Sequence, residues 1–160
     1  MFQTNDLKAK WEKDVLTFLK GKRITSVAYM TNEEVDNFGW YESTLEFTLN
    51  DGGILTASSD DEGNSAGTWF GKDTEFPVCS TNDTKGIKTF SKEAQQFVGK
   101  TIDSVRYFND KEMEAYGWYK APLVIAFTDG EILFSACDDE GNNGGSIFTN
   151  YKNLSTIPTI

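Results

Sequence analysis

Carboxylates are the side chains of this chain whose spacing could do chemistry. A run of three, Asp60-Asp61-Glu62, is followed by Gly63-Asn64, and the same pentapeptide recurs in the second half of the chain, starting at Asp138. Neighbouring carboxylates can bind a cation, act as the two catalytic carboxyl groups of a glycosidase, or contact a basic partner. The sequence contains no His, which excludes a Cys–His catalytic pair and a His-bearing zinc site.

The acidic pentapeptide departs from a helix–loop–helix calcium site. Such a loop places oxygen ligands at alternate positions, with Gly sixth and Glu twelfth. Here the acids are consecutive, Gly is fourth and the flanks read as strands, whose successive side chains point to opposite faces. A strand-ending turn is our interpretation, and an acidic contact patch and a metal site are the alternatives. We expect no metal and no other cofactor.

The pentapeptide belongs to an internal repeat. At the same offset, which carries Asp60 onto Asp138, Gly39-Trp40-Tyr41 matches Gly117-Trp118-Tyr119, and Asp51-Gly52 matches Asp129-Gly130. The repeat predicts an α+β fold of two tandem units related by a pseudo-twofold axis. Each unit is expected to hold a helix and a three- or four-stranded antiparallel sheet.

The repeat also sets the expected boundaries. Unit 1 covers 1–79, a polar linker covers 80–90, and unit 2 covers 91–160, and we expect them to form one compact body. Apolar periodicity places the elements within each unit. They are a helix over 5–20 with strands near 23–30, 44–50 and 53–59, and a helix over 91–98 with strands near 101–108, 122–128 and 131–137.

Each unit contains an Asp-Gly pair between two apolar strands. This dipeptide favours a two-residue hairpin turn. Such a turn would pair Leu49 with Ile54 in unit 1, and Phe127 with Ile132 in unit 2.

Negative charge is concentrated in unit 1. The formal net charge is −10, yet no Lys or Arg stands between Arg23 and Lys72, a window that holds nine acids. The matching window of unit 2 also holds nine acids, but it adds Arg106, Lys111 and Lys120. Such a surface repels nucleic acid and anionic membranes and attracts basic partners. The alternative is that the charge serves solubility alone.

Two stretches of unit 1 combine acidic residues with polar neighbours. Strand 44–50 alternates its apolar residues with Glu46 and Thr48, so its second face is expected to meet water. The segment between the first two strands reads as a polar loop, and its acids are Glu33, Glu34 and Asp36.

The sequence also bears on location. Its first residues lack the basic start and apolar run of a signal peptide, and no apolar stretch approaches the roughly 20 residues of a membrane span. Two Cys are fewer than a disulfide framework usually uses. We therefore expect a cytoplasmic protein with reduced thiols that binds neither membrane nor nucleic acid.

In size and charge the chain resembles the immunity proteins of bacterial toxin–immunity pairs, including those that guard against contact-dependent growth inhibition nucleases. The resemblance implies a binding protein, not an enzyme, whose carboxylates meet Lys and Arg in the cleft of a basic toxin domain. The expected partner-binding carboxylates are Glu33, Glu34, Asp36, Glu42, Asp60, Asp61 and Glu62. The expected aromatic anchors are Trp40, Tyr41 and Trp69.

The duplicated Gly-Trp-Tyr triplet supports an alternative function. Trp40 and Trp118 could form stacking platforms in a small-ligand or carbohydrate-binding module. Aromatic residues that recur in a repeat are more often part of a core or an interface, so we rank this alternative second.

Overall fold

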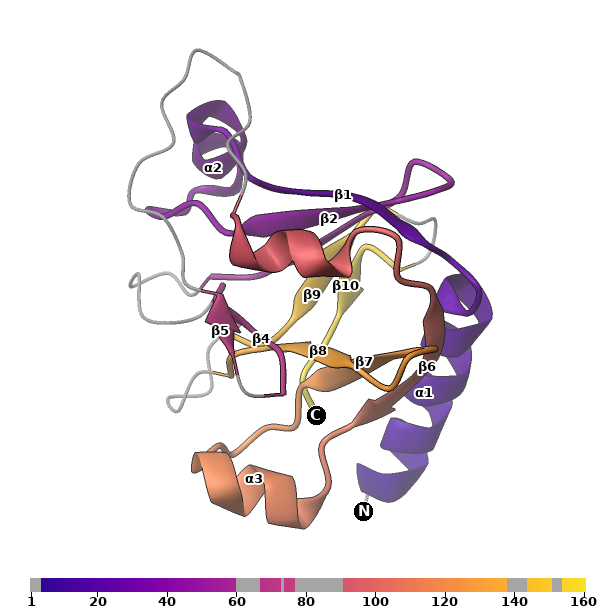
Figure 1. Cartoon of the computed structure of the whole chain (residues 1–160). Coiled ribbons are helices and arrows are strands. Elements are labelled where there is room, and N and C mark those ends of the chain that lie inside the picture. The colour runs from indigo at the N-terminus through magenta and orange to yellow at the C-terminus, as the bar shows by residue number, and fades with distance from the viewer. Residues whose placement is uncertain (1–3, 60–66, 73, 77–90, 138–143, 151–153) are drawn as a thin grey trace.

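The structure is a computed structural model that describes residues 4–59, 67–72, 74–76, 91–137, 144–150 and 154–160. Within these ranges the chain has an α+β fold of three α-helices, one 3-10 helix and two antiparallel sheets (Figure 1). The helices are α1 (Thr4–Leu19), α2 (Asn32–Phe38), the 3-10 helix η1 (Glu93–Phe97) and α3 (Asp110–Tyr116). The strands are β1 (Ile24–Tyr29), β2 (Leu45–Leu49), β3 (Ile54–Ala57), β4 (Trp69–Phe70), β5 (Glu75–Phe76), β6 (Ile102–Tyr107), β7 (Leu123–Phe127), β8 (Ile132–Ser135), β9 (Ile147–Thr149) and β10 (Thr156–Ile157).

Each sheet takes strands from both halves of the chain. The first sheet has the order β1-β2-β3-β9-β10, and the second has the order β5-β4-β8-β7-β6. Ile147 of β9 lies opposite Ala57 of β3, and Trp69 of β4 lies opposite Ser135 of β8. Each half therefore supplies two strands to the sheet of the other half, and neither half completes a sheet by itself.

The first strands of the two sheets are joined by backbone hydrogen bonds. The Gly21 N–H donates to the Ile102 carbonyl at 2.8 Å, and the Gly99 N–H donates to the Ile24 carbonyl at 2.7 Å. Gly99 and Ile102 are the counterparts of Gly21 and Ile24 in the repeat. Each of the two hydrogen bonds therefore joins residues that match those of the other, with donor and acceptor halves reversed. β1 and β6 each carry a register shift beside this junction, and a bulge there accounts for their broken alternation of apolar residues.

The larger of two apolar clusters among the described residues lies between the two sheets. Phe47 of β2 packs edge-on against Trp69 of β4, with ring centroids 5.0 Å apart, and against Phe97 of η1, with centroids 6.0 Å apart. α1 runs along β6 (Figure 1) and buries Val15 and Leu19 in the same core. The shared core and exchanged strands make one body of the described parts of both halves.

The prediction of a polar loop after the first strand is wrong, because that segment forms α2. The Thr31 hydroxyl accepts a hydrogen bond from the Glu34 N–H (3.2 Å), and the Glu34 carboxylate accepts from the Thr31 N–H (2.9 Å). This reciprocal capping box satisfies two N–H groups that a helix start leaves free. Gly39, with φ of 74°, ends the helix. α3 begins with the same box, made by Asn109 and Glu112.

The two-residue turn predicted at the first hairpin is also wrong. Ile54 lies opposite Thr48 instead of Leu49, and the Leu49 N–H donates to the Gly53 carbonyl. The loop therefore has three residues. Gly52 occupies its last position with φ of 88°, the left-handed conformation that such a loop requires.

The second hairpin differs from its prediction in the same way. Ile132 lies opposite Ala126 instead of Phe127. The Glu131 N–H donates to the Asp129 carboxylate at 3.0 Å, a bond two residues along the chain that stabilises the longer loop. The one-residue difference matters because it changes which side chains face each other across the sheet.

Candidate functional site

The predicted site residues that the structure describes gather mainly at α2 and the segment after it. α2 lies at one end of the molecule, and α3 lies at the opposite end (Figure 1). Asp60, Asp61 and Glu62 lie outside the described residues. The predicted residues found on or directly after α2 are Glu33, Glu34, Asp36, Trp40, Tyr41 and Glu42.

Trp69 is not available as an anchor for a partner. Its side chain is fully buried between the sheets, and its indole N–H donates to the Leu45 carbonyl at 3.2 Å. Trp69 sits in β4, which pairs with β8 of the other half of the chain, and this pairing places the ring in the shared core. The sequence did not reveal the strand exchange, and the prediction for Trp69 failed for that reason.

The carboxylates around α2 point outward. Val35 faces the protein interior and is buried, whereas Glu33 and Asp36 are exposed and Glu42 is half-buried. Ion pairs between described residues form elsewhere, and no described Lys or Arg lies within ion-pair distance of Glu33, Asp36 or Glu42. Carboxylates without a cation partner keep their full negative potential at the surface.

α3 carries acids too, but one of them is neutralised. Arg106 donates to both oxygens of Glu112, at 2.6 and 2.9 Å. The hydrogen bond from Arg106 is the main reason that the pKa of Glu112 lies below its ordinary value, and the same bond raises the pKa of Arg106. The repeat aligns Arg106 with Ala28, so Glu34 on α2 has no Arg at the matching position. Two further cations of this region, Lys111 and Lys120, match Glu33 and Glu42.

Aromatic rings form a small cluster beneath α2. Trp40 stacks on Phe38 with centroids 4.5 Å apart and meets Phe148 of β9 edge-on at 5.8 Å. Only 9% of Trp40 is exposed, so its prediction as an anchor is wrong in the folded chain. Tyr41 is 70% exposed and Phe38 is 44% exposed, and these two present aromatic surface beside the carboxylates.

A groove of about 280 Å³ opens between the end of α2 and the face of the first sheet formed by β2, β3 and β9. Glu46 faces this groove and is only 5% exposed, which corrects the expectation that its side of β2 meets water. β9, which comes from the second half of the chain, extends this sheet and adds Phe148 to the wall of the groove. The groove is lined by Phe38, Glu46, Ile54, Phe148, Thr149, Asn150 and Ser155.

The matching face of the second sheet is filled with rings. In the first sheet Glu46 lies opposite Thr56, and Thr56 lies opposite Phe148. The residues at the matching positions of the second sheet, in the same cross-strand order, are Val124, Phe134 and Phe70. Phe134 and Phe70 stack with centroids 5.6 Å apart. The small Thr56 thus replaces a large ring, and a carboxylate replaces an apolar side chain.

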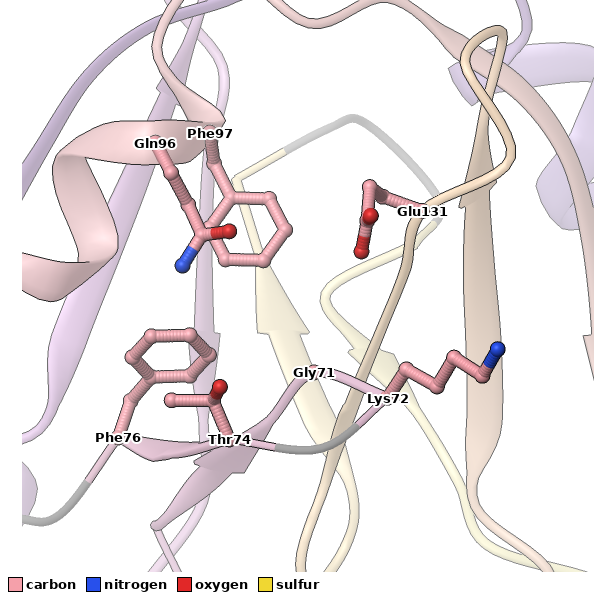
Figure 2. Close-up of a pocket in the computed structure, with 7 residues that line it drawn as sticks. All are labelled: Gly71, Lys72, Thr74, Phe76, Gln96, Phe97 and Glu131. Atoms are coloured by element: carbon pink, nitrogen blue, oxygen red, sulfur yellow. The ribbon is translucent and has the colours of Figure 1, made fainter.

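A second pocket, of about 310 Å³, lies between η1, β5 and the loop that precedes β8 (Figure 2). Phe76 and Phe97 form its inner wall with centroids 5.5 Å apart, and both are almost fully buried. Figure 2 shows Glu131 on one side of the space and the Lys72 side chain running away from the two rings. Because the rings pack against each other and the core, this pocket offers a ligand little aromatic surface.

Neither cysteine completes a site in the described residues. Cys137 is buried, and Cys79 lies outside the described residues. Among the positions that the structure describes, no group of three or more Cys, Asp or Glu is placed to hold a metal ion. The helices in the same part of the chain are all too short or too polar to cross a membrane.

Comparisons with known proteins give no identity for the chain. No protein-family model, no curated protein and no solved structure matches it.

Proposed function

We propose that this chain is an acidic binding protein that neutralises a basic protein partner, and that it acts as an immunity protein against a cognate nuclease toxin in the cytoplasm. One observation carries the proposal. Glu33, Asp36 and Glu42 have no cation partner among the described residues, while the matching region at α3 carries Arg106 and two Lys. A surface that keeps its carboxylates unpaired is suited to a partner that brings the cations.

The same asymmetry supports a duplicated scaffold with one specialised copy. We propose that the two halves are related by a pseudo-twofold axis, because the junction bonds of Gly21 and Gly99 are reciprocal and the paired strands keep the same register when the repeat aligns one half with the other. Reciprocal contacts of this kind are what a twofold relation produces. A duplicated scaffold lets the charge of one end change while the core is kept.

The proposed contact surface combines charge with aromatic anchors. Unpaired carboxylates accelerate the encounter with a basic partner. Tyr41 and Phe38 are partly exposed rings beside those carboxylates, and aromatic residues of this kind contribute much of the binding energy at protein interfaces. The surface therefore offers both long-range attraction and short-range contact.

Co-expression with the toxin domain encoded immediately upstream of this chain's gene tests the proposal. The native chain should restore growth, and the variant Glu33→Lys/Asp36→Lys/Glu42→Lys should not. Its affinity for the purified toxin domain should fall by about a hundredfold or more, because each reversal places like charges in contact. Calorimetry measures the affinity, and circular dichroism checks the fold.

The matched control is Asp103→Lys/Asp110→Lys/Glu114→Lys, which reverses three exposed acids of the second half. Both variants change the formal net charge by the same amount. The control should keep its affinity within about threefold if local contacts decide binding, since distant exposed charges are screened by salt. Equal loss in both variants, or an upstream gene that encodes no toxic domain, would contradict the proposed function.

A further inference from the structure

Exposed aromatic side chains stand at matching positions at the two ends of the molecule. Tyr116 is 41% exposed and Tyr119 is 80% exposed, and the repeat aligns them with Phe38 and Tyr41 at α2. In the described part of the chain, Val98 is the one other large apolar residue that is exposed. Exposed apolar surface that is gathered in one place marks interaction sites, whereas scattered residues do not. The end of the molecule at α3 therefore has the composition of an interaction surface.

The charges at α3 include both signs. Asp110, Lys111 and Glu114 of the helix and Lys120 after it are all exposed. Among the described residues, no group of opposite charge lies within ion-pair distance of any of the four. Two acids and two cations arranged in this way can pair with the same set on another molecule.

We propose that the α3 surface binds the α3 surface of a second copy of this chain. This surface consists of Asp110, Lys111, Glu114, Tyr116, Tyr119 and Lys120. The contact is isologous, so both copies present the same residues and each ion pair forms twice. The inference goes beyond the proposed function and does not rest on it, because it uses no residue of α2.

The order of the charges along the chain suits a twofold axis. An axis perpendicular to α3 makes the two copies of the helix antiparallel, so the start of one lies opposite the end of the other. Asp110, the first residue of α3, then faces the partner's Lys120, which follows the end of the helix. Lys111 faces the partner's Glu114 in the same arrangement. Each of the four charges thus receives a charge of opposite sign.

Tyr116 is held in place before any contact forms. Its ring stacks on Trp118, with centroids 4.7 Å apart, and lies 5.4 Å from the ring of Phe108. A side chain that is already fixed loses little conformational entropy when a partner covers its exposed part. Tyr119 adds the larger exposed ring, and tyrosines are enriched among the residues that dominate binding energy at interfaces.

The α2 end is not self-complementary in this way. The repeat aligns Lys111 with Glu33. It aligns Lys120 with Glu42, so the two cations of the α3 surface are both replaced by acids. Two α2 ends in contact would place acid against acid, which is unfavourable. α2 and α3 lie at opposite ends of the molecule (Figure 1), so a dimer formed through α3 leaves both α2 ends exposed.

The contact is small, so the dimer should be weak. α3 has seven residues, and interfaces below about 1,200 Å² are typical of transient complexes. We expect a dissociation constant of about 0.1 mM. It is best measured at a salt concentration of about 0.1 M, where a Debye length of about 10 Å screens the repulsion between two chains of net charge −10.

Sedimentation velocity on the full chain, from about 10 μM to about 1 mM, tests the assembly. The weight-average mass should rise from that of one chain toward that of two and then level off, because an isologous contact closes at two copies. A mass that stays at one chain over the whole range would overturn the proposal. A mass that grows past two chains would overturn it as well, since it would show a head-to-tail contact.

Two charge-reversal variants identify the surface. The first is Lys111→Glu/Lys120→Glu, and the second is Asp110→Lys/Glu114→Lys. Each alone places like charges across the axis and should dimerise at least about tenfold more weakly than the native chain. An equal mixture of the two should form a heterodimer at least as strong as the native dimer, because every ion pair is restored with its signs exchanged. A mixture of folded variants that does not associate would refute the inference.

A matched control separates the α3 surface from total charge. Asp36→Lys/Glu93→Lys reverses two exposed acids on α2 and η1, away from α3 (Figure 1), and changes the net charge as much as the second variant does. It should dimerise as the native chain does, and circular dichroism checks the fold of every variant. An equal loss of dimer in this control would contradict the assigned surface.

Tyr119→Ala tests the aromatic part of the contact without a change of charge. Because Tyr119 is 80% exposed, the substitution should leave the fold intact. It should weaken the dimer about tenfold by removing the ring that a second copy would cover. Unchanged dimerisation of this variant would show that the ring lies outside the contact and would overturn the surface as defined.

Discussion

Arg106 donates to both carboxylate oxygens of Glu112 and so neutralises one acid of α3. The corresponding acid of α2, Glu34, has Ala28 at the position that matches Arg106. The two helices therefore begin with the same capping box, but the arginine that pairs with the capping acid of α3 has no counterpart at the matching position of the first half. At α3 Arg106 pairs with Glu112, whereas no described Lys or Arg lies within ion-pair distance of Glu33 or Asp36 on α2.

The Arg106–Glu112 pair should make stability depend on pH in the acid range. Its hydrogen bond lowers the pKa of Glu112 below the ordinary value of 4.5, so the stabilisation is complete above that value and is lost as the pH falls through the lower, folded-state pKa. Replacing Arg106 by Met should cost about 0.5–1 kcal/mol at pH 7, since the pair is partly exposed. Urea unfolding at pH 7 and pH 2.5 measures the difference, which should nearly vanish at the lower pH. A constant difference would show that packing of the Arg stem, not the charge, decides the effect.

Tyr107 should add a dependence on alkaline pH. Burial, and then the charge of Glu12, raise the pKa of its hydroxyl, which donates to the Pro158 carbonyl at 2.8 Å. A raised pKa means that the stabilisation is present below the ordinary value of 10.0 and is lost as the pH rises above it. Tyr107→Phe should lower the free energy of unfolding by about 1 kcal/mol at pH 8. It should also reduce the decline of this free energy between pH 8 and pH 11. The matched control is Tyr119→Phe, at a position 80% exposed, which should change neither quantity.

Trp69 should be critical to stability, not to binding. Trp69→Phe removes part of a fully buried ring and the hydrogen bond to the Leu45 carbonyl, and we expect a loss of about 1–3 kcal/mol in the free energy of unfolding. The same substitution at the half-buried Trp11 of α1 should cost less. Chemical denaturation measures both. An undiminished stability for Trp69→Phe would contradict its place in the shared core.

The strand exchange predicts that the halves depend on each other. A fragment of residues 1–90 keeps β1, β2 and β3 but lacks β9 and β10, which complete their sheet. We expect it to unfold without cooperativity when alone and to regain native circular dichroism when mixed with fragment 91–160. A cooperative unfolding transition for either fragment alone would show that a half can close its own core.

The local sequence contained signals for most of the described elements, including two that we misread. Thr31 and Glu34, three residues apart, are the signature of a capping box, yet the density of acids around them suggested a loop. The Asp51-Gly52 pair did mark a hairpin, but the side-chain bond from the Gly53 N–H to Asp51 and the left-handed Gly52 produce a loop one residue longer. Both differences arise between neighbouring residues, so the local sequence contains the information that decides them.

What the sequence by itself determined is six of the ten described strands, the constant offset that relates the two halves and the uneven distribution of charge, because periodicity, turn residues and charge are local properties. Only the tertiary structure decided which strands pair across the halves, since β3 and β9 are far apart in the chain and many partners satisfy the same apolar pattern. That pairing buries Trp69 in the core and encloses Glu46 beside Phe148. The groove takes its shape because β9 of the second half extends the first sheet and adds Phe148 to its wall.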